Sequence, residues 1–111
     1  MEAWLLADAA TIAPFLGVSR DNIPIDPESL DDPKQAVINL ARRSSKRSIR
    51  EGMVPRVGSG SLVGPTYVAD VNEYARSHWR PEVAATVSPS LQRCLDRIHE
   101  LVQGYMHLAT P

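Results

Sequence analysis

The sequence predicts a mainly α fold of four to six short helices joined by long loops, within a single domain of 111 residues. Apolar residues recur at steps of three and four along several segments, which is the spacing of one helix face. No stretch alternates between apolar and polar residues as a half-buried strand would. Nine prolines separate these segments, so the helices are expected to be short.

The first eight residues, from Met1 to Asp8, are apolar except for Glu2 and Asp8. A run that is apolar on all sides normally belongs in a protein core. Such a run is unusual at a chain end, because terminal residues fray unless something ties them down. We therefore expect residues 1–111 to form a partial, C-terminal domain, whose opening run is covered by a protein partner or by a missing N-terminal half.

A short helix is expected after Asp8, whose carboxylate can accept hydrogen bonds from the free backbone N–H groups of the first turn. Pro14 keeps this helix short or kinks it, and Gly17 supplies the left-handed residue that ends it. Two X-Pro steps hold most of residues 18–32 in an extended connection, with one helical turn over residues 27–30.

Pro33, preceded by two aspartates, marks a strong helix start, because its missing N–H costs nothing in a first turn. This helix should cover residues 33–43. A second short helix is expected over residues 46–51, ended by Gly52. Residues 57–64 hold three glycines and two serines and are expected to form a mobile loop.

The last third of the chain predicts two longer helices. The first covers residues 65–79, with an inner stripe of Val68, Val71, Ala75 and Trp79 and with Tyr67 and Tyr74 beside it. A brief turn follows, and Ser88 with Pro89 then forms the clearest boundary in the chain. The final helix is expected to end at Gly104, before a frayed tail of residues 105–111. Its predicted buried residues are Leu91, Cys94, Leu95, Ile98, Leu101 and Val102.

The net charge of -1 hides an uneven distribution of charge along the chain. Residues 1–32 hold seven acids and one base, whereas residues 34–56 hold seven bases and one acid. Such asymmetry is typical of a polyanion-binding face, and equally of two segments of one domain that attract each other.

No apolar run approaches the roughly 20 residues that span a bilayer. A single cysteine excludes an internal disulfide, and we expect a cytoplasmic protein without membrane association.

Glu2 and Asp8 are the candidate catalytic residues, since they alone bracket an apolar segment. An acid in such surroundings can bind a divalent cation or carry a shifted pKa, and Glu2 is the candidate metal ligand. The alternatives are a helix cap for Asp8 and a solvent-facing position for Glu2. The three histidines lack a partner at ligand spacing, and Cys94 is expected in the core rather than as a nucleophile.

A basic cluster is the second candidate site. Three of its arginines fall at helical steps if one helix continues through Ser44 and Ser45. The planar guanidinium fork of arginine suits phosphate oxygens, so the cluster predicts contact with nucleic acid. Its members are Arg42, Arg43, Lys46, Arg47 and Arg50.

The run Glu2-Ala3-Trp4-Leu5-Leu6-Ala7-Asp8 resembles the internal E-x-W-L-L-x-D segment of domain-of-unknown-function family 4276. The similarity covers almost the whole chain and continues through Phe15-Leu16-Gly17, Asp32-Pro33-Lys34, residues 41–50, Gly64-Pro65 and Ser88-Pro89-Ser90-Leu91. Members of this family are bacterial proteins that resemble the topoisomerase-primase (Toprim) fold. That fold is an α/β domain that uses clustered acids and Mg²⁺ in phosphoryl transfer, and some relatives occur in phage-defence systems.

The resemblance implies that this chain corresponds to the helical C-terminal half of such a domain. Family members carry acidic strand motifs upstream, so Glu2 is the one matched acid that would lie near the Mg²⁺ centre. Two-metal chemistry needs several convergent carboxylates, and we expect neither a competent nuclease nor a cofactor in this chain alone. Three hypotheses follow: part of a Toprim-like, nucleic-acid-directed protein, a self-standing nucleic-acid-binding helical module, or an interaction protein that docks through its opening run.

Overall fold

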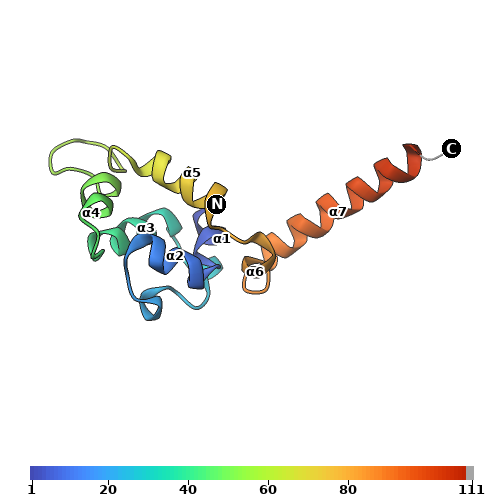
Figure 1. Cartoon of the computed structure of the whole chain (residues 1–111), viewed down its shortest axis with the longest axis horizontal. Coiled ribbons are helices and arrows are strands. Elements are labelled where there is room, and N and C mark those ends of the chain that lie inside the picture. Colours follow the sequence, from blue (N-terminus) through green and yellow to red (C-terminus); the bar gives the residue numbers. More distant parts are fainter. Residues whose placement is uncertain (110–111) are drawn as a thin grey trace.

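The computed structural model describes residues 1–109, with side chains described as far as Met106, and this part of the chain contains helices and no strand. The mainly α prediction is confirmed. The elements in chain order are α1 (Glu2–Leu6), α2 (Ala9–Leu16), η1 (Arg20–Asn22), η2 (Pro27–Ser29), α3 (Pro33–Arg42), α4 (Arg47–Met53), α5 (Tyr67–Ser77), α6 (Pro81–Ala84) and α7 (Pro89–Ala109). Figure 1 shows α7 projecting from the body formed by the other helices, and the molecule measures 60 × 27 × 25 Å.

Helix α1 lies at the centre of the body. Its side chains Leu5 and Leu6 are buried, as is Ala7 behind it, and the helix packs against α2, α3, η2 and α6. Other elements of the same chain therefore cover these three residues. Met1 is 69% exposed, and further cover of the opening run by a partner or by a missing N-terminal half stays a prediction.

Helices α2 and α3 begin and end where local chemistry predicts. Gly17 adopts φ 71° at the end of α2, and its carbonyl accepts a hydrogen bond of 2.8 Å from the backbone N–H of Ser45. At the start of α3, the carboxylate of Asp32 accepts the backbone N–H of Gln35 at 3.1 Å. The single helical turn predicted over residues 27–30 is present as η2.

Helix α4 does not continue from α3. The helical conformation is interrupted at Ser44, whose buried hydroxyl accepts the backbone N–H of Lys46 at 2.9 Å. Gly52 was predicted to end α4, but the helix runs on to Met53. Gly52 serves instead as a contact point, because the backbone N–H of Thr66 donates to its carbonyl at 2.9 Å. A Cβ at this position would stand 2.0 Å from the Thr66 hydroxyl oxygen.

The buried face of α5 differs from the predicted stripe. Tyr67, Val71 and Tyr74 are buried, whereas Val68 is 64% exposed. The inner face therefore follows the two tyrosines, which lie against the core formed by α1 to α4. The predicted stripe is wrong at Val68, because the apolar pattern alone does not distinguish its face from that of its neighbour Tyr67. Its other members hold, since Val71 is buried and Ala75 and Trp79 pack partly buried against the same core.

Helix α7 begins at Pro89 as predicted, after Ser88, whose hydroxyl accepts the backbone N–H of Leu91 at 3.4 Å. It does not end at Gly104 but continues to Ala109, so the predicted tail is helical as far as residue 109, and residues 110 and 111 lie outside the described part. The predicted burial is wrong beyond the first two turns. Leu91 is buried and Leu95 half-buried, but residues 96–106 of α7 extend beyond the body and are exposed.

Candidate functional site

Glu2 and Asp8 occupy separate environments. The Glu2 carboxylate, on α1, accepts a hydrogen bond of 2.9 Å from the hydroxyl of Tyr67. Burial, with this bond in addition, raises the pKa of Tyr67 well above its usual value. Among the described residues, no three Asp, Glu, His or Cys side chains gather closely enough to hold a metal ion. The roles of Glu2 as a metal ligand and of Glu2 and Asp8 as catalytic residues stay predictions of the sequence.

Asp8 is fully buried at the corner between α1 and α2 and forms an ion pair with Arg80. Its Oδ1 accepts Nη2 of Arg80 at 2.7 Å, and its Oδ2 accepts both Nε and the backbone N–H of Arg80 at 3.1 Å. The Thr11 hydroxyl donates to Oδ2 at 2.6 Å and shares a 2.7 Å hydrogen bond with Tyr74. Asp8 stands at the predicted N-cap position, yet its side chain accepts no backbone N–H of α2. The donors from Arg80 and Thr11 occupy the carboxylate instead.

The donors around Asp8 also decide its charge. Burial alone would raise the pKa of this carboxyl, but the hydrogen bonds from Arg80 and Thr11 and the charge of the guanidinium outweigh burial and hold the pKa below its usual value. Burial raises the pKa of Tyr74 to about 12. Asp8 is therefore an ionised, fully paired group that joins the start of α2 to the segment between α5 and α6.

A second polar contact, which is partly buried, fixes the start of α7. The Glu28 carboxylate accepts the hydroxyls of Ser88 and Ser90 and, at 2.8 Å, the backbone N–H of Ser90. The indole N–H of Trp4 donates to the Ser90 hydroxyl at 2.8 Å. The two serine hydroxyls are the main reason that the pKa of Glu28 lies below its usual value. The sequence shows the cap at Ser88 but carries no signal for an acid 60 residues upstream.

We expect acid to destabilise the fold through Asp8 and Glu28. A carboxyl whose pKa is lowered by folding contributes stability above its unfolded pKa, about 4 for these two residue types, and loses it as the pH falls through the folded value. The free energy of unfolding, measured by urea denaturation, should therefore decline as the pH falls below about 5. Asp8→Asn should flatten the decline and Asp31→Asn, on an exposed acid, should not. An equal slope for Asp8→Asn and the unchanged chain would contradict this assignment.

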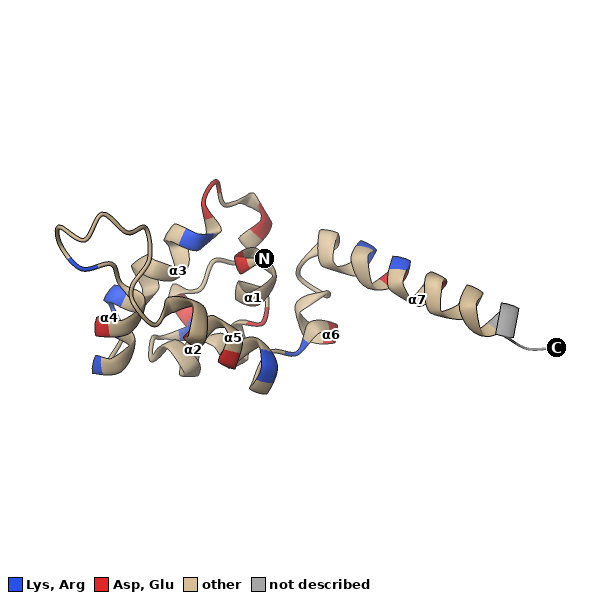
Figure 2. Cartoon of the chain, turned by 90° about the horizontal axis from the view of Figure 1, so that it is seen from above, with Lys and Arg blue, Asp and Glu red and all other residues tan. Residues whose placement is uncertain are grey.

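The five predicted nucleic-acid-binding residues are all exposed and lie together at the end of α3 and on α4. We call them the basic surface: Arg42, Arg43, Lys46, Arg47 and Arg50. They do not share one continuous helix, as the predicted spacing required, because the helix is interrupted at Ser44. Figure 2 shows basic residues gathered around α4, with an acidic residue on the same helix. That acid is Glu51, which pairs with Arg47 at 2.8 Å, both side chains being exposed.

Two further residues of the basic surface are held by backbone carbonyls. Arg50 donates from Nη1 to the carbonyl of Ser44 at 2.7 Å, and Lys46 donates from Nζ to the carbonyl of Phe15 at 3.1 Å. These bonds orient the side chains without neutralising their charge. Within the described residues, Arg47 is the one member that forms an ion pair.

The outer part of α7 carries an exposed apolar stripe. We call it the α7 face: Ile98, Leu101, Val102 and Tyr105, which are 51%, 62%, 49% and 75% exposed. Their steps of three and four place them on one side of the helix. The sequence marked the first three as apolar positions but predicted them to be buried. Figure 1 shows that this part of α7 extends away from the body, where no other element covers it.

Comparisons with protein-family models, curated proteins and solved structures gave no match to this chain. The resemblance to family 4276 and its Toprim-like relatives therefore stays a prediction. Within the described residues, no helix combines the length and apolar character that crossing a bilayer requires. The geometry of the basic surface and of the α7 face is thus what supports a function.

Proposed function

We propose that this chain is a protein-interaction module that associates with a second copy of itself through the α7 face. The observation that carries the proposal is a helix of 21 residues that leaves the body with large apolar side chains exposed along one side. A helix with such a stripe gains stability by burying it, and contiguous exposed apolar patches mark interaction sites. Two such helices can pack their stripes together as a coiled coil does.

The charges of α7 favour a second copy as the partner. Its described part carries two bases, Arg93 and Arg97, and two acids, Asp96 and Glu100. None of these lies within the α7 face, so two copies can approach without like charges meeting at the centre of the contact. A two-fold interface uses the same patch on both chains, and a charge-balanced, apolar patch meets that requirement. A strongly charged partner helix would find no complementary charge here.

The test compares two variants that add the same charge to different sides of α7. Leu101→Glu places a carboxylate in the α7 face, and Gln103→Glu places one outside it. In sedimentation velocity over a range of concentrations, the unchanged chain and Gln103→Glu should associate as dimers, and Leu101→Glu should be a monomer with unchanged helix content. A monomeric unchanged chain at about 100 µM, well above the micromolar range of weak specific association, would refute the proposal, as would equal association of the two variants.

A second proposal is that the basic surface binds the phosphate backbone of nucleic acid. It is supported by four exposed cations without an ion-pair partner in the described residues, gathered over the end of α3 and α4. Arginine and lysine at such density release counterions from a duplex when they contact phosphates. The binding would be independent of sequence. It accords with the nucleic-acid-directed role that the resemblance to family 4276 implies, without phosphoryl-transfer chemistry in this chain.

We expect a generic DNA duplex to bind with a strong salt dependence. Each phosphate contact contributes roughly -0.9 to the slope of log K against log salt. The double variant Arg42→Gln/Arg43→Gln should reduce this slope by about 2, whereas Arg76→Gln/Arg97→Gln removes two bases elsewhere and should leave it unchanged. Fluorescence anisotropy with a labelled duplex, recorded over a range of salt concentrations, measures the slope for each variant. A slope near zero, or no binding at low salt, would remove the second proposal.

A further inference from the structure

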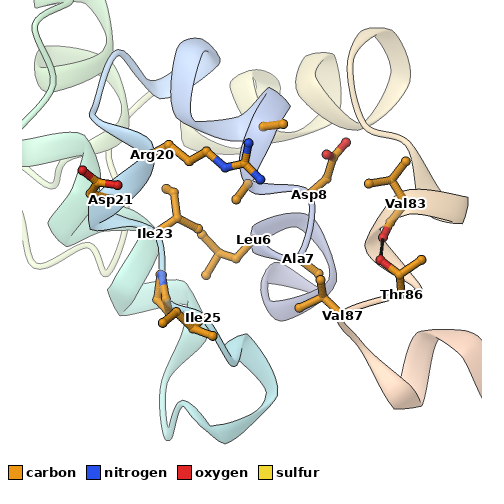
Figure 3. A pocket seen from close by; sticks show the side chains of 13 residues that line it. Leu6, Ala7, Asp8, Arg20, Asp21, Ile23, Ile25, Val83, Thr86 and Val87 are labelled. Carbon is orange, nitrogen blue, oxygen red and sulfur yellow. Dashed lines mark hydrogen bonds between the residues drawn. The ribbon is translucent and has the colours of Figure 1, made fainter.

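A cavity of about 450 Å³ lies between the corner of α1 and α2, the segment from η1 to Ile25, and α6 (Figure 3). We call it the Arg20 pocket. Its floor is made by Leu6, Ala7 and Ile23, all of which are buried. This volume falls in the range of about 300–1,000 Å³ that small-molecule sites occupy. Neither the basic surface nor the α7 face lines it.

Two apolar side chains at the rim of the Arg20 pocket are uncovered. Ile25 is 95% exposed and Val87 is 41% exposed, and both line the cavity, one on the segment after η1 and the other behind α6. Together with the apolar floor, they form walls that would lose contact with water if an apolar group entered. Burial of apolar surface is favourable in proportion to its area.

A single uncompensated cation reaches over this apolar floor. Figure 3 shows the Arg20 side chain reaching from η1 toward the cavity that Ile23 and Leu6 also line. Arg20 forms no ion pair and no side-chain hydrogen bond among the described residues. Of the two acids that line the cavity, Asp8 is already paired with Arg80, and Asp21 lies at the outer edge. The pocket therefore offers one free guanidinium beside an apolar chamber.

We propose that the Arg20 pocket binds a small molecule with one anionic head group and an apolar body. The head group accepts hydrogen bonds from the Arg20 fork, which matches the two oxygens of a carboxylate. The body lies on Leu6, Ala7 and Ile23 and is covered by Ile25 and Val87. A neutral molecule of the same shape retains the apolar contact and loses the charged one.

Octanoate, 1-octanol and acetate separate the two parts of this recognition. In amide NMR titrations of the full chain, octanoate should shift resonances of residues 6–7, 20–25 and 83–87. Arg20→Gln should weaken octanoate binding about tenfold, the factor expected for a hydrogen bond to a charged group, and leave 1-octanol binding unchanged. Acetate should bind much more weakly than octanoate, because it lacks the body.

Three results would overturn the proposal: no octanoate shifts at the pocket, equal octanoate affinity in Arg20→Gln, or acetate binding as tightly as octanoate. Arg20 is exposed and forms none of the contacts that hold the core, so the variant should fold, and its amide spectrum verifies this. Arg93→Gln is the control for loss of a distant charge. Leu101→Glu should bind octanoate like the unchanged chain, which makes this test independent of self-association.

Discussion

Replacing Arg80 with leucine should lower the free energy of unfolding by about 1–3 kcal/mol, the cost of leaving a buried acceptor, here the Asp8 carboxylate, without its donors. The variant removes two side-chain donors from Asp8, which is fully buried, and leaves a carboxylate without its countercharge. The loss stays below that of a fully buried ion pair because the Arg80 side chain is 42% exposed, and because the backbone N–H of residue 80 and the Thr11 hydroxyl still donate to Asp8. Urea denaturation at pH 7 measures the change.

The double variant Asp8→Asn/Arg80→Leu provides the decisive comparison. It removes the buried charge along with its partner, so it should be less destabilised than the sum of the two single variants. Arg76→Leu is the matched control, because Arg76 pairs with Glu73 and both side chains are exposed. Its expected effect is below about 1 kcal/mol. Equal losses in Arg76→Leu and Arg80→Leu would show that the Asp8 pair contributes little.

Gly64→Ala should destabilise the body by about 1–3 kcal/mol, the cost of adding a methyl group to a packed site. A Cβ at this position would lie 2.3 Å from the carbonyl oxygen of Gly52 and 2.5 Å from the carbonyl carbon of Met53. Both are backbone atoms, which cannot rotate away as a side chain can. The backbone N–H of Gly64 also donates to the carbonyl of Met53 at 3.0 Å, and the added group would displace this bond between α4 and the segment before α5.

Gly104→Ala is the control of opposite sign. A Cβ there meets nothing within 4 Å, and alanine favours a helix interior over glycine by roughly 0.5–1 kcal/mol. Thermal melts should therefore show a lower midpoint for Gly64→Ala than for the unchanged chain, and amide exchange in α7 should slow by about 2- to 5-fold in Gly104→Ala. An unchanged midpoint for Gly64→Ala would mean that α4 and the segment before α5 do not pack as closely as described.

The two proposed interaction surfaces are compatible in one molecule. Figure 1 shows α4, with the basic surface, at one end of the long axis and the outer part of α7 at the other. Association through the α7 face would leave both basic surfaces free and join two phosphate-binding sites in one particle. Linked sites bind a polymer more tightly than one site does. The Leu101→Glu monomer should then bind a long duplex more weakly than the unchanged chain.

The sequence by itself determined where several helices begin and end. Pro33 after Asp32, Pro89 after Ser88, and Gly17 act on backbone groups within about four residues, and the structure places α3, α7 and the end of α2 accordingly. These signals are local, because a cap or a left-handed residue satisfies hydrogen-bonding groups of its own turn. The basic surface could also be named from sequence, since charged side chains seldom leave the surface.

Only the tertiary structure decided which side chains meet. Asp8 and Arg80 are 72 residues apart, and nothing in the sequence links one acid to one base at that distance. The α7 face shows the same limit, since its apolar spacing predicts a helix with one apolar side, whether or not anything covers that side. Periodicity describes a helix alone, and whether its apolar side is buried depends on where the neighbouring helices lie, which here leaves the outer turns of α7 exposed.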